Sequence, residues 1–306
     1  MTAAFEPPAK AKAKGDPRSR LGRFAIWWRR NSNFAVNLSL FVFVGILLLS
    51  VFADALAPYD PSAIDLRSRL QPPAWAGGAG EDWAHPLGTD RIGRDVLSRT
   101  LHGGRVSLAI GLLASLAGLV VGTALGLISG YVRGAFDHLI MYLIDVQLSL
   151  PFILLAIALA LILGSSLIVL IGIAALSAWP FYARVVRGSV LSLRRREFTI
   201  AAQALGASPL HIIVRHLLPN VLSPILVIAT LSLARIILLE SGLSFLGIGV
   251  PPTIPSWGNM IDEGRGNLNN AAWIALAPSL FLMLLTMAVG TVGDWLRDVT
   301  DVTIDR

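Results

Sequence analysis

The sequence has no cysteine, few lysines and a low content of charged residues of either sign. Without thiols, the chain forms no disulfide and no cysteine-ligated zinc or iron–sulfur site. Charged residues make up 14% of its 306 residues, against about one quarter in a typical soluble protein. Hydrophobic residues make up 55% and are gathered into runs too long for strands. These shortages exclude a disulfide-stapled secreted domain and indicate an integral membrane protein.

Lysine and histidine are too scarce for several kinds of catalytic site. No lysine follows Lys14, and a Walker A loop needs Gly-Lys-Ser/Thr to cradle nucleotide phosphates, so this chain cannot hydrolyse ATP. Four histidines show no metal-ligand spacing: His102, His138, His211 and His216. No nucleophile–base pair of a membrane-embedded hydrolase is present. We therefore expect a non-catalytic chain with no metal site and no cofactor of its own.

The positive charge is concentrated in residues 1–33 at the N-terminus. A net charge of +6 would suit a nucleic-acid-binding protein, but no aromatic–basic platform or groove-reading motif accompanies it. A basic tail before an apolar run is what the positive-inside rule expects of a cytoplasmic N-terminus. The run that follows, residues 34–53, is longer than the about 7–15 apolar residues of a signal peptide. We therefore interpret it as a membrane anchor.

Six apolar stretches are long enough to cross a bilayer, which takes about 20 helical residues. They cover residues 34–53, 106–130, 136–163, 167–186, 220–248 and 271–293. Six spans place both termini on the same side, so the predicted fold is an all-α polytopic membrane protein. The predicted regions are a cytoplasmic tail (1–33), a first span (34–53), an extracytoplasmic loop (54–105), a core of five spans (106–293) with a cytoplasmic loop (187–219), and a cytoplasmic C-terminal tail (294–306).

The second span has glycines at every fourth position: Gly118, Gly122, Gly126 and Gly130. Residues four apart share a helix face, so these glycines form a groove without side chains. Such small-residue faces let two helix backbones approach closely within lipid. The stripe therefore predicts close helix packing, either inside this chain or at an interface with another subunit.

The cytoplasmic loop has the residue pattern of two short helices joined by a tight turn. Phe198, Ala202 and Leu205 share one helical face. Gly206 supplies the left-handed position that ends a helix. Ser208 and Pro209 suit the start of a second helix, which we expect to stop before Pro219.

This loop resembles the EAA loop of ATP-binding-cassette (ABC) importer permeases. The resemblance is carried by Ala201-Ala202, Gly206 after three further residues, and Leu218-Pro219 at the expected distance. Three other segments are similar to hallmarks of the dipeptide/oligopeptide/nickel branch: His85-Pro-Leu-Gly-Thr-Asp-Arg-Ile-Gly-Arg-Asp-Val-Leu-Ser-Arg99, Leu243-Ser-Phe-Leu-Gly-Ile-Gly249 and Pro255-Ser-Trp-Gly-Asn-Met260. The match runs in order from about Phe34 to the C-terminus.

The loop departs from the family pattern at two positions. Ile200 stands where a glutamate would begin the motif, and His216 stands where an aliphatic residue is usual. Glu197, three residues before Ile200 and on the same helical face, can replace the missing charge.

The resemblance implies a type I ABC importer permease in a bacterial inner membrane. It implies a homologous second permease, two ATPase subunits that bind ATP and Mg²⁺, an extracytoplasmic solute-binding protein, surrounding lipid, and no nucleic acid. Peptides are the leading cargo, with nickel or another small solute as the alternative. The implied coupling residues are Glu197, Ala201, Ala202, Gly206, Ser208, Pro209, Leu218 and Pro219. An ion-gradient-driven secondary transporter is the rival class, but its inverted repeats and paired broken helices are not found here.

Two further polar sets are candidate functional residues. Residues 85–105 predict an interfacial helix with Asp90, Arg94 and Asp95, acting as a structural lid or as a contact for the binding protein. Asp145 and Glu240 lie in or near apolar spans, where charged side chains usually face the bundle interior. Each is expected either to line the solute route or to form a structural pair, with Arg235 or with backbone groups.

Overall fold

The computed structural model describes residues 33–76, 83–164 and 166–300. Within these ranges the regular elements are helices, together with one isolated bridge between Thr89 and Asp95. Five helical spans are long and apolar enough to cross a membrane, and six result if one bent helix pair counts as a span. The longest helices are α2 (Phe34–Val51), α4 (Val96–Val132), α7 (Leu167–Leu193), α10 (Leu218–Phe245) and α12 (Trp273–Thr300). The predicted all-α polytopic fold is confirmed. The basic tail at 1–32 and residues 301–306 lie outside the described residues.

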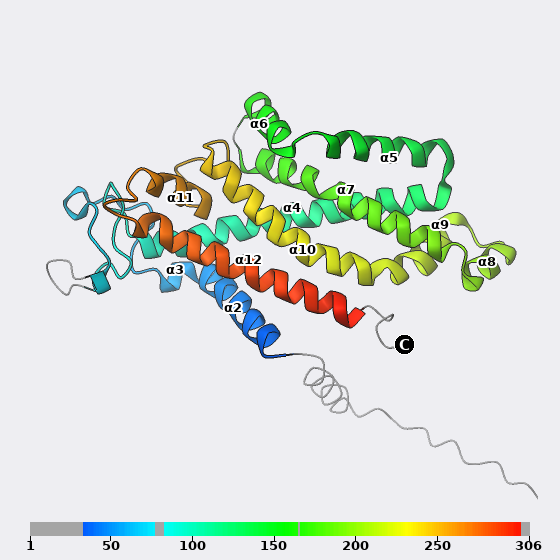
Figure 1. Cartoon of the computed structure of the whole chain (residues 1–306), viewed down its shortest axis with the longest axis horizontal. Helices are drawn as coiled ribbons and strands as arrows, with labels where there is room; N and C mark the ends of the chain where they lie inside the picture. The colour runs from blue at the N-terminus through cyan, green and yellow to red at the C-terminus, as the bar shows by residue number, and fades with distance from the viewer. Residues whose placement is uncertain (1–32, 77–82, 165, 301–306) are drawn as a thin grey trace, which may run out of the picture.

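The long helices run beside one another, and the connecting elements gather at the two ends of the bundle (Figure 1). One end carries α3 (Ala53–Leu56), the turns η1 (Leu66–Ser68) and η2 (Ala74–Ala76), and α11 (Trp257–Arg265). The opposite end carries α8 (Glu197–Ala204) and α9 (Pro209–Ile212). The bundle therefore separates the loop predicted outside from the loop predicted inside.

The predicted third span, residues 136–163, is not one straight helix. It consists of α5 (Gly134–Ser149) and α6 (Phe152–Leu163), bent by 93°. Pro151 lies at the bend, and proline disfavours the helical region for the residue before it. Figure 1 shows α6 turned away from the line of α5.

The predicted interfacial helix over residues 85–105 is wrong in its first half. Helix begins only at Val96, in one continuous α4 of 37 residues, because the carboxylate of Asp95 caps it and accepts from the amide of Ser98 (2.7 Å). Before it, the carboxylate of Asp90 accepts from the amides of Ile92 (2.9 Å) and Arg94 (3.0 Å). Aspartate thus organises a turn here rather than a helix.

One other predicted boundary is also wrong. The helix after Ser208 does not stop before Pro219, since α9 continues through the π-helical turn η3 (Ile213–Leu217) into α10. The helix that contains the predicted sixth span, α12, continues past residue 293 to Thr300 and takes in part of the predicted C-terminal tail.

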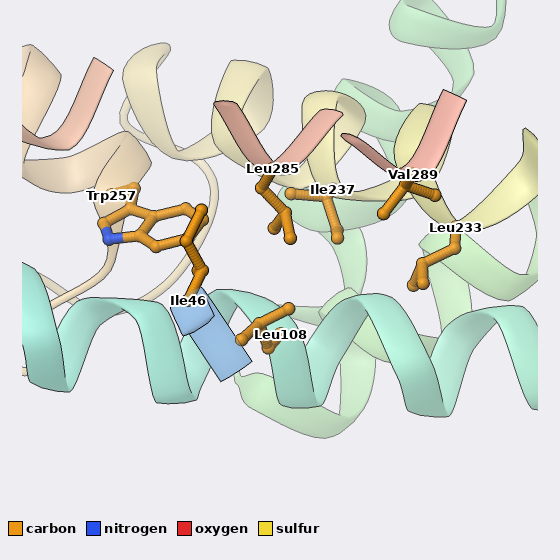
Figure 2. Close-up of a cluster of buried hydrophobic side chains, with 7 residues drawn as sticks. All are labelled: Ile46, Leu108, Leu233, Ile237, Trp257, Leu285 and Val289. Atoms are coloured by element: carbon orange, nitrogen blue, oxygen red, sulfur yellow. The ribbon is translucent and has the colours of Figure 1, made fainter. Parts of the chain in front are cut away.

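An apolar cluster joins five of the helices (Figure 2). Ile46 of α2 and Leu108 of α4 lie near Leu285 of α12 and Ile237 of α10 in this cluster. Trp257 of α11 lies at one end of the cluster and is fully buried (Figure 2). Its indole N–H donates a hydrogen bond to the carbonyl of Thr100 (2.9 Å). The cluster fixes α2, α4, α10 and α12 as one unit.

Candidate functional site

The turn between α8 and α9 has the geometry that its sequence predicts. Gly206 adopts φ +80°, and its amide donates to the carbonyl of Gln203 (3.0 Å). The amide of Ala207 donates to the carbonyl of Ala202 (3.1 Å), which completes a Schellman motif. The hydroxyl of Ser208 then accepts from the amide of His211 (3.3 Å) and caps α9, with Pro209 as its first residue. We call α8, this turn, α9 and η3, up to Pro219, the hairpin.

The base of the hairpin is fixed to the bundle. Thr199 is fully buried, and its hydroxyl donates to the carbonyl of Leu193 at the end of α7 (2.9 Å). Ile212 and Leu217 are also fully buried, in a cluster that includes Val186 of α7. The hairpin and α7 are therefore mechanically connected through packed side chains.

The tip of the hairpin exposes large apolar side chains. Leu205 is 88% exposed and Leu210 is 71% exposed. Phe198, Ile200 and Val214 are exposed beside them. Large apolar side chains exposed together on a protein surface typically mark an interaction site.

The other predicted coupling residues differ in their accessibility. Glu197, Ala201 and Pro219 are exposed, whereas Ala202 and Leu218 are half-buried against the apolar cluster that joins the hairpin to the bundle. Glu197 and Ala201 are thus open to a partner, while Ala202 supports the turn from inside.

The histidines of the hairpin lie closer together than their spacing suggests. The rings of His211 and His216 have centroids 5.7 Å apart, because the π-helical turn brings residues five apart onto one face. Within the described part of the chain, no three histidine, aspartate or glutamate side chains form a group that could hold a metal ion.

The predicted lid residues form a buried ion-pair network at the opposite end of the bundle. Arg99 is 2% exposed and contacts the carboxylates of both Asp90 and Glu263 of α11. Arg94 also bridges these acids, at 2.6 Å to Asp90 and 2.8 Å to Glu263. Burial raises the pKa of Asp90, but the backbone amides of Arg94 and Ile92 and the charges of Arg99 and Arg94 outweigh it, so this pKa is lowered overall.

Asp95 is also buried in this region, and its carboxylate contacts the ring of His85 (2.9 Å) as well as capping α4. Since Asp90 and Asp95 are both at most 2% exposed, they offer little surface to a binding protein. The geometry favours the structural lid among the two alternatives for these residues.

The glycine stripe of α4 packs inside this chain. A Cβ atom on Gly118 would contact Ala178 of α7 at 2.7 Å, and one on Gly122 would contact Tyr182 of α7 at 2.7 Å and overlap the carbonyl oxygen of Trp179. Gly126 and Gly130 meet α7 in the same way. The stripe therefore joins α4 to α7. Of the two predicted kinds of contact, it makes the one inside this chain and not an interface with another subunit.

The two acids predicted for the solute route have different environments. Asp145 of α5 is exposed and forms an ion pair with Arg184 of α7 (2.7 Å). Glu240 is fully buried and accepts from the hydroxyl of Ser244 (2.8 Å). That burial favours the structural role of Glu240, although its partner is a serine and not Arg235.

Three adjoining pockets of about 330, 340 and 410 Å³ form a groove along the seam between α7 and α10. The first two share Phe181 and Arg235, and the second and third share Ile228 and Leu231. We call this feature the α7–α10 groove.

The guanidinium of Arg235 lies over the Phe181 ring, 4.2 Å from its centroid. The sequence analysis considered Arg235 only as a partner for Asp145 or Glu240, although an arginine inside an apolar run is itself a signal of function.

Two sequence families match this chain. The model described as a binding-protein-dependent transport system inner membrane component matches residues 122–305. The model described as the N-terminal TM domain of oligopeptide transport permease C matches residues 25–73.

Curated relatives are similar over nearly the whole chain. The di/tripeptide transport system permease protein DppC of Pseudomonas aeruginosa is 40% identical over 84% of this chain and 84% of its own length. The dipeptide transport system permease protein DppC of Haemophilus influenzae is 36% identical over 93% of this chain and 95% of its own length.

A solved structure has the same fold. The inward-facing MetNI methionine ABC transporter has a chain that aligns with a TM-score of 0.55 and 22% identity, covering 66% of this chain and 96% of that one. Together with the spans and the family matches, these findings lead to one conclusion: the chain belongs to the inner-membrane components of binding-protein-dependent transport systems, and it is a multi-pass permease subunit of an ABC importer.

Proposed function

We propose that this permease carries di- and oligopeptides and is driven through its hairpin by separate ATPase subunits. Peptide cargo is supported by the names of the relatives, which are peptide and dipeptide permeases and do not favour the nickel alternative. The assembly comprises this chain, a homologous second permease, two ABC ATPases that bind ATP and Mg²⁺, and an extracytoplasmic binding protein. This chain contributes no catalytic residue and no cofactor to it.

The observation that carries the proposal is the apolar tip of the hairpin, where Leu205 and Leu210 are largely exposed. A solvated loop would not be expected to hold such side chains in water on a stiff turn. A groove on an ATPase subunit would cover them and would push on the hairpin as the two ATPases close over ATP. Because Thr199 and Ile212 tie the hairpin to the bundle, that push reaches α7 and α10.

This assignment orients the chain in the membrane. The hairpin is placed in the cytoplasm, together with both chain termini, and the network of Asp90 and Glu263 is placed outside. Asp145, exposed on α5 and paired with Arg184, is proposed to border the solute route. Asp90, Arg94 and Asp95 are proposed to brace the outer loop.

The turn at Gly206 provides the test. The Gly206→Val variant should uncouple ATP hydrolysis from uptake, because a β-branched residue is strongly disfavoured at φ +80°. A Cβ atom there meets nothing within 4 Å, so any effect comes from the backbone and not from a clash. Peptide uptake and ATPase activity are measured on the complete complex in proteoliposomes.

The matched control is Gly206→Asn, because asparagine tolerates the left-handed conformation better than other non-glycine residues. It should retain most of the uptake. Unchanged uptake by the valine variant, at normal protein levels, would refute the coupling role of this turn.

A further inference from the structure

Arg235 is a cation placed within the membrane-spanning part of α10. It lies ten residues before Phe245, where α10 ends, which is roughly 15 Å along a helix and close to half of the hydrocarbon thickness. The arginines that form ion pairs within the described residues are others: Arg94, Arg99, Arg105, Arg184, Arg187 and Arg265.

The position of Arg235 indicates whether its face of α10 contacts lipid, water or protein. Its side chain is exposed on the surface of the single chain, and an arginine at this depth is costly when it faces lipid. Its guanidinium lies over the ring of Phe181 of α7, and the residue lines two of the pockets of the α7–α10 groove. This face therefore meets a water-filled route or protein rather than hydrocarbon.

The stacking of Arg235 prepares it to bind an anion. The guanidinium carbon lies 4.2 Å from the centre of the Phe181 ring, and no hydrogen-bond or ion-pair partner for the N–H groups of its planar fork is found within the described residues. This planar fork matches a carboxylate through two parallel hydrogen bonds.

Neighbouring polar groups in the groove are already engaged. Arg184 is paired with Asp145 (2.7 Å). The side-chain amide of Gln147 donates to the carbonyl of Leu176 (2.6 Å) and accepts from the indole of Trp179 (2.9 Å). The inner end of the groove carries a further cation, Arg297. The groove thus has an excess of positive charge.

We infer that Arg235, stacked on Phe181, binds the C-terminal carboxylate of the peptide cargo as it passes along the α7–α10 groove. This inference rests on the proposed peptide function. A linear peptide carries this carboxylate whatever its side chains, so one fixed arginine can recognise cargoes of different sequence.

The test compares two cargoes in proteoliposomes that contain the complete complex: dialanine and its C-terminal amide. The measured quantity is the ratio of ATP-driven uptake of the acid to uptake of the amide. The same binding protein serves every variant, so its own preference cancels when these ratios are compared. Arg235→Gln should lower the ratio about tenfold, as expected for loss of a charge-assisted hydrogen bond. Arg235→Lys should lower it about threefold, because an ammonium lacks the planar fork.

The matched control is Arg265→Gln, which removes an arginine stacked on Phe245 (5.2 Å) outside the groove. It should leave the ratio unchanged. If Arg235→Gln fails to assemble, the lysine variant decides, and an unchanged ratio there overturns the inference.

Equal losses of acid and amide uptake in Arg235→Gln would also overturn the inference and point to a packing or subunit contact. An effect that disappears in vesicles without anionic lipid would assign the guanidinium to an anionic lipid headgroup instead. Wild-type complex that imports neither cargo would refute the proposed peptide function itself, which is a separate result.

Discussion

At the scale of single residues, the buried network at the outer end shows how charge is stabilised away from water. The carboxylate of Asp90 accepts hydrogen bonds from backbone amides and from two arginines, so its ionised form is favoured despite burial. Arg99 in turn relies on both Asp90 and Glu263. Removing one member leaves a buried charge with fewer partners, which costs more than the pair itself contributes.

We predict that Asp90→Asn lowers the free energy of unfolding by about 3 kcal/mol near neutral pH, because it breaks a buried ion pair. The folded-state pKa of Asp90 lies below its unfolded value of about 3.9. Its contribution is therefore fully present above that value and is lost as the pH falls through the folded-state pKa. Thermal unfolding in detergent from pH 7 to pH 3 should show a smaller acid-induced loss for the variant than for wild type.

The matched control is Asp54→Asn. Asp54 pairs with Arg105 (3.0 Å) but is largely exposed, and exposed ion pairs contribute little. Equal thermal shifts in the two variants would contradict the role assigned to burial.

Residue roles that depend on local chemistry were predictable from the sequence, whereas those that depend on distant partners were not. Gly206 and Ser208 have the turn and cap geometry that their neighbours indicate. Glu263 joins Arg99 across 164 positions, and Phe181 reaches Arg235 from another helix. No local pattern encodes these contacts, so the network and the α7–α10 groove emerge only from the fold.

At the scale of helices, the close approach of α4 and α7 depends on missing side chains. We predict that Gly122→Ala destabilises the protein by about 3 kcal/mol, at the upper end for overpacking. The reason is that the added Cβ atom would overlap the carbonyl oxygen of Trp179 and lie 2.7 Å from Tyr182. The measurement is the midpoint of thermal unfolding, followed by circular dichroism in detergent.

Gly172→Ala in α7 serves as the control, because a Cβ atom there meets nothing within 4 Å. Alanine has the higher helix propensity, so this variant should be as stable as wild type or slightly more stable. If Gly122→Ala behaved like Gly172→Ala, the proposed tight α4–α7 contact would be wrong.

Apolar runs predicted where helices lie better than where they bend or end. The run at 136–163 is apolar enough on average to read as one span, yet the chain bends by 93° at Pro151. Pro180 and Pro278 lie inside continuous helices, because a proline kinks or is accommodated according to what packs around it. The sequence of α12 likewise remains helical past Asp294, since an acid at an aqueous end does not stop a helix.

At the scale of the whole molecule, the lack of cysteine makes topology directly testable. A single introduced thiol can be labelled without competition from any other thiol in this chain. We predict that Trp75→Cys, at a position 73% exposed in the outer loop, reacts with a membrane-impermeant maleimide in intact spheroplasts. Leu205→Cys, at the hairpin tip, should react only after the membrane is permeabilised, in cells that express this chain without the ATPase subunits proposed to cover the tip.

Normal membrane levels of both cysteine variants confirm that each is folded. Labelling of Leu205→Cys in intact spheroplasts would place the hairpin on the outer face and would invert the orientation proposed for the complex.

The uninterrupted path from α9 through η3 into α10 makes a rod of 37 residues, Pro209–Phe245. Such a rod is roughly 55 Å long, so a tilt of about ten degrees about one end moves the other end by about 10 Å. A small angular movement imposed on the hairpin is thereby amplified at the far side of the bilayer. Because Arg235 lies along this lever, the same stroke that opens one side would also move the guanidinium, and whatever it holds, sideways within the membrane.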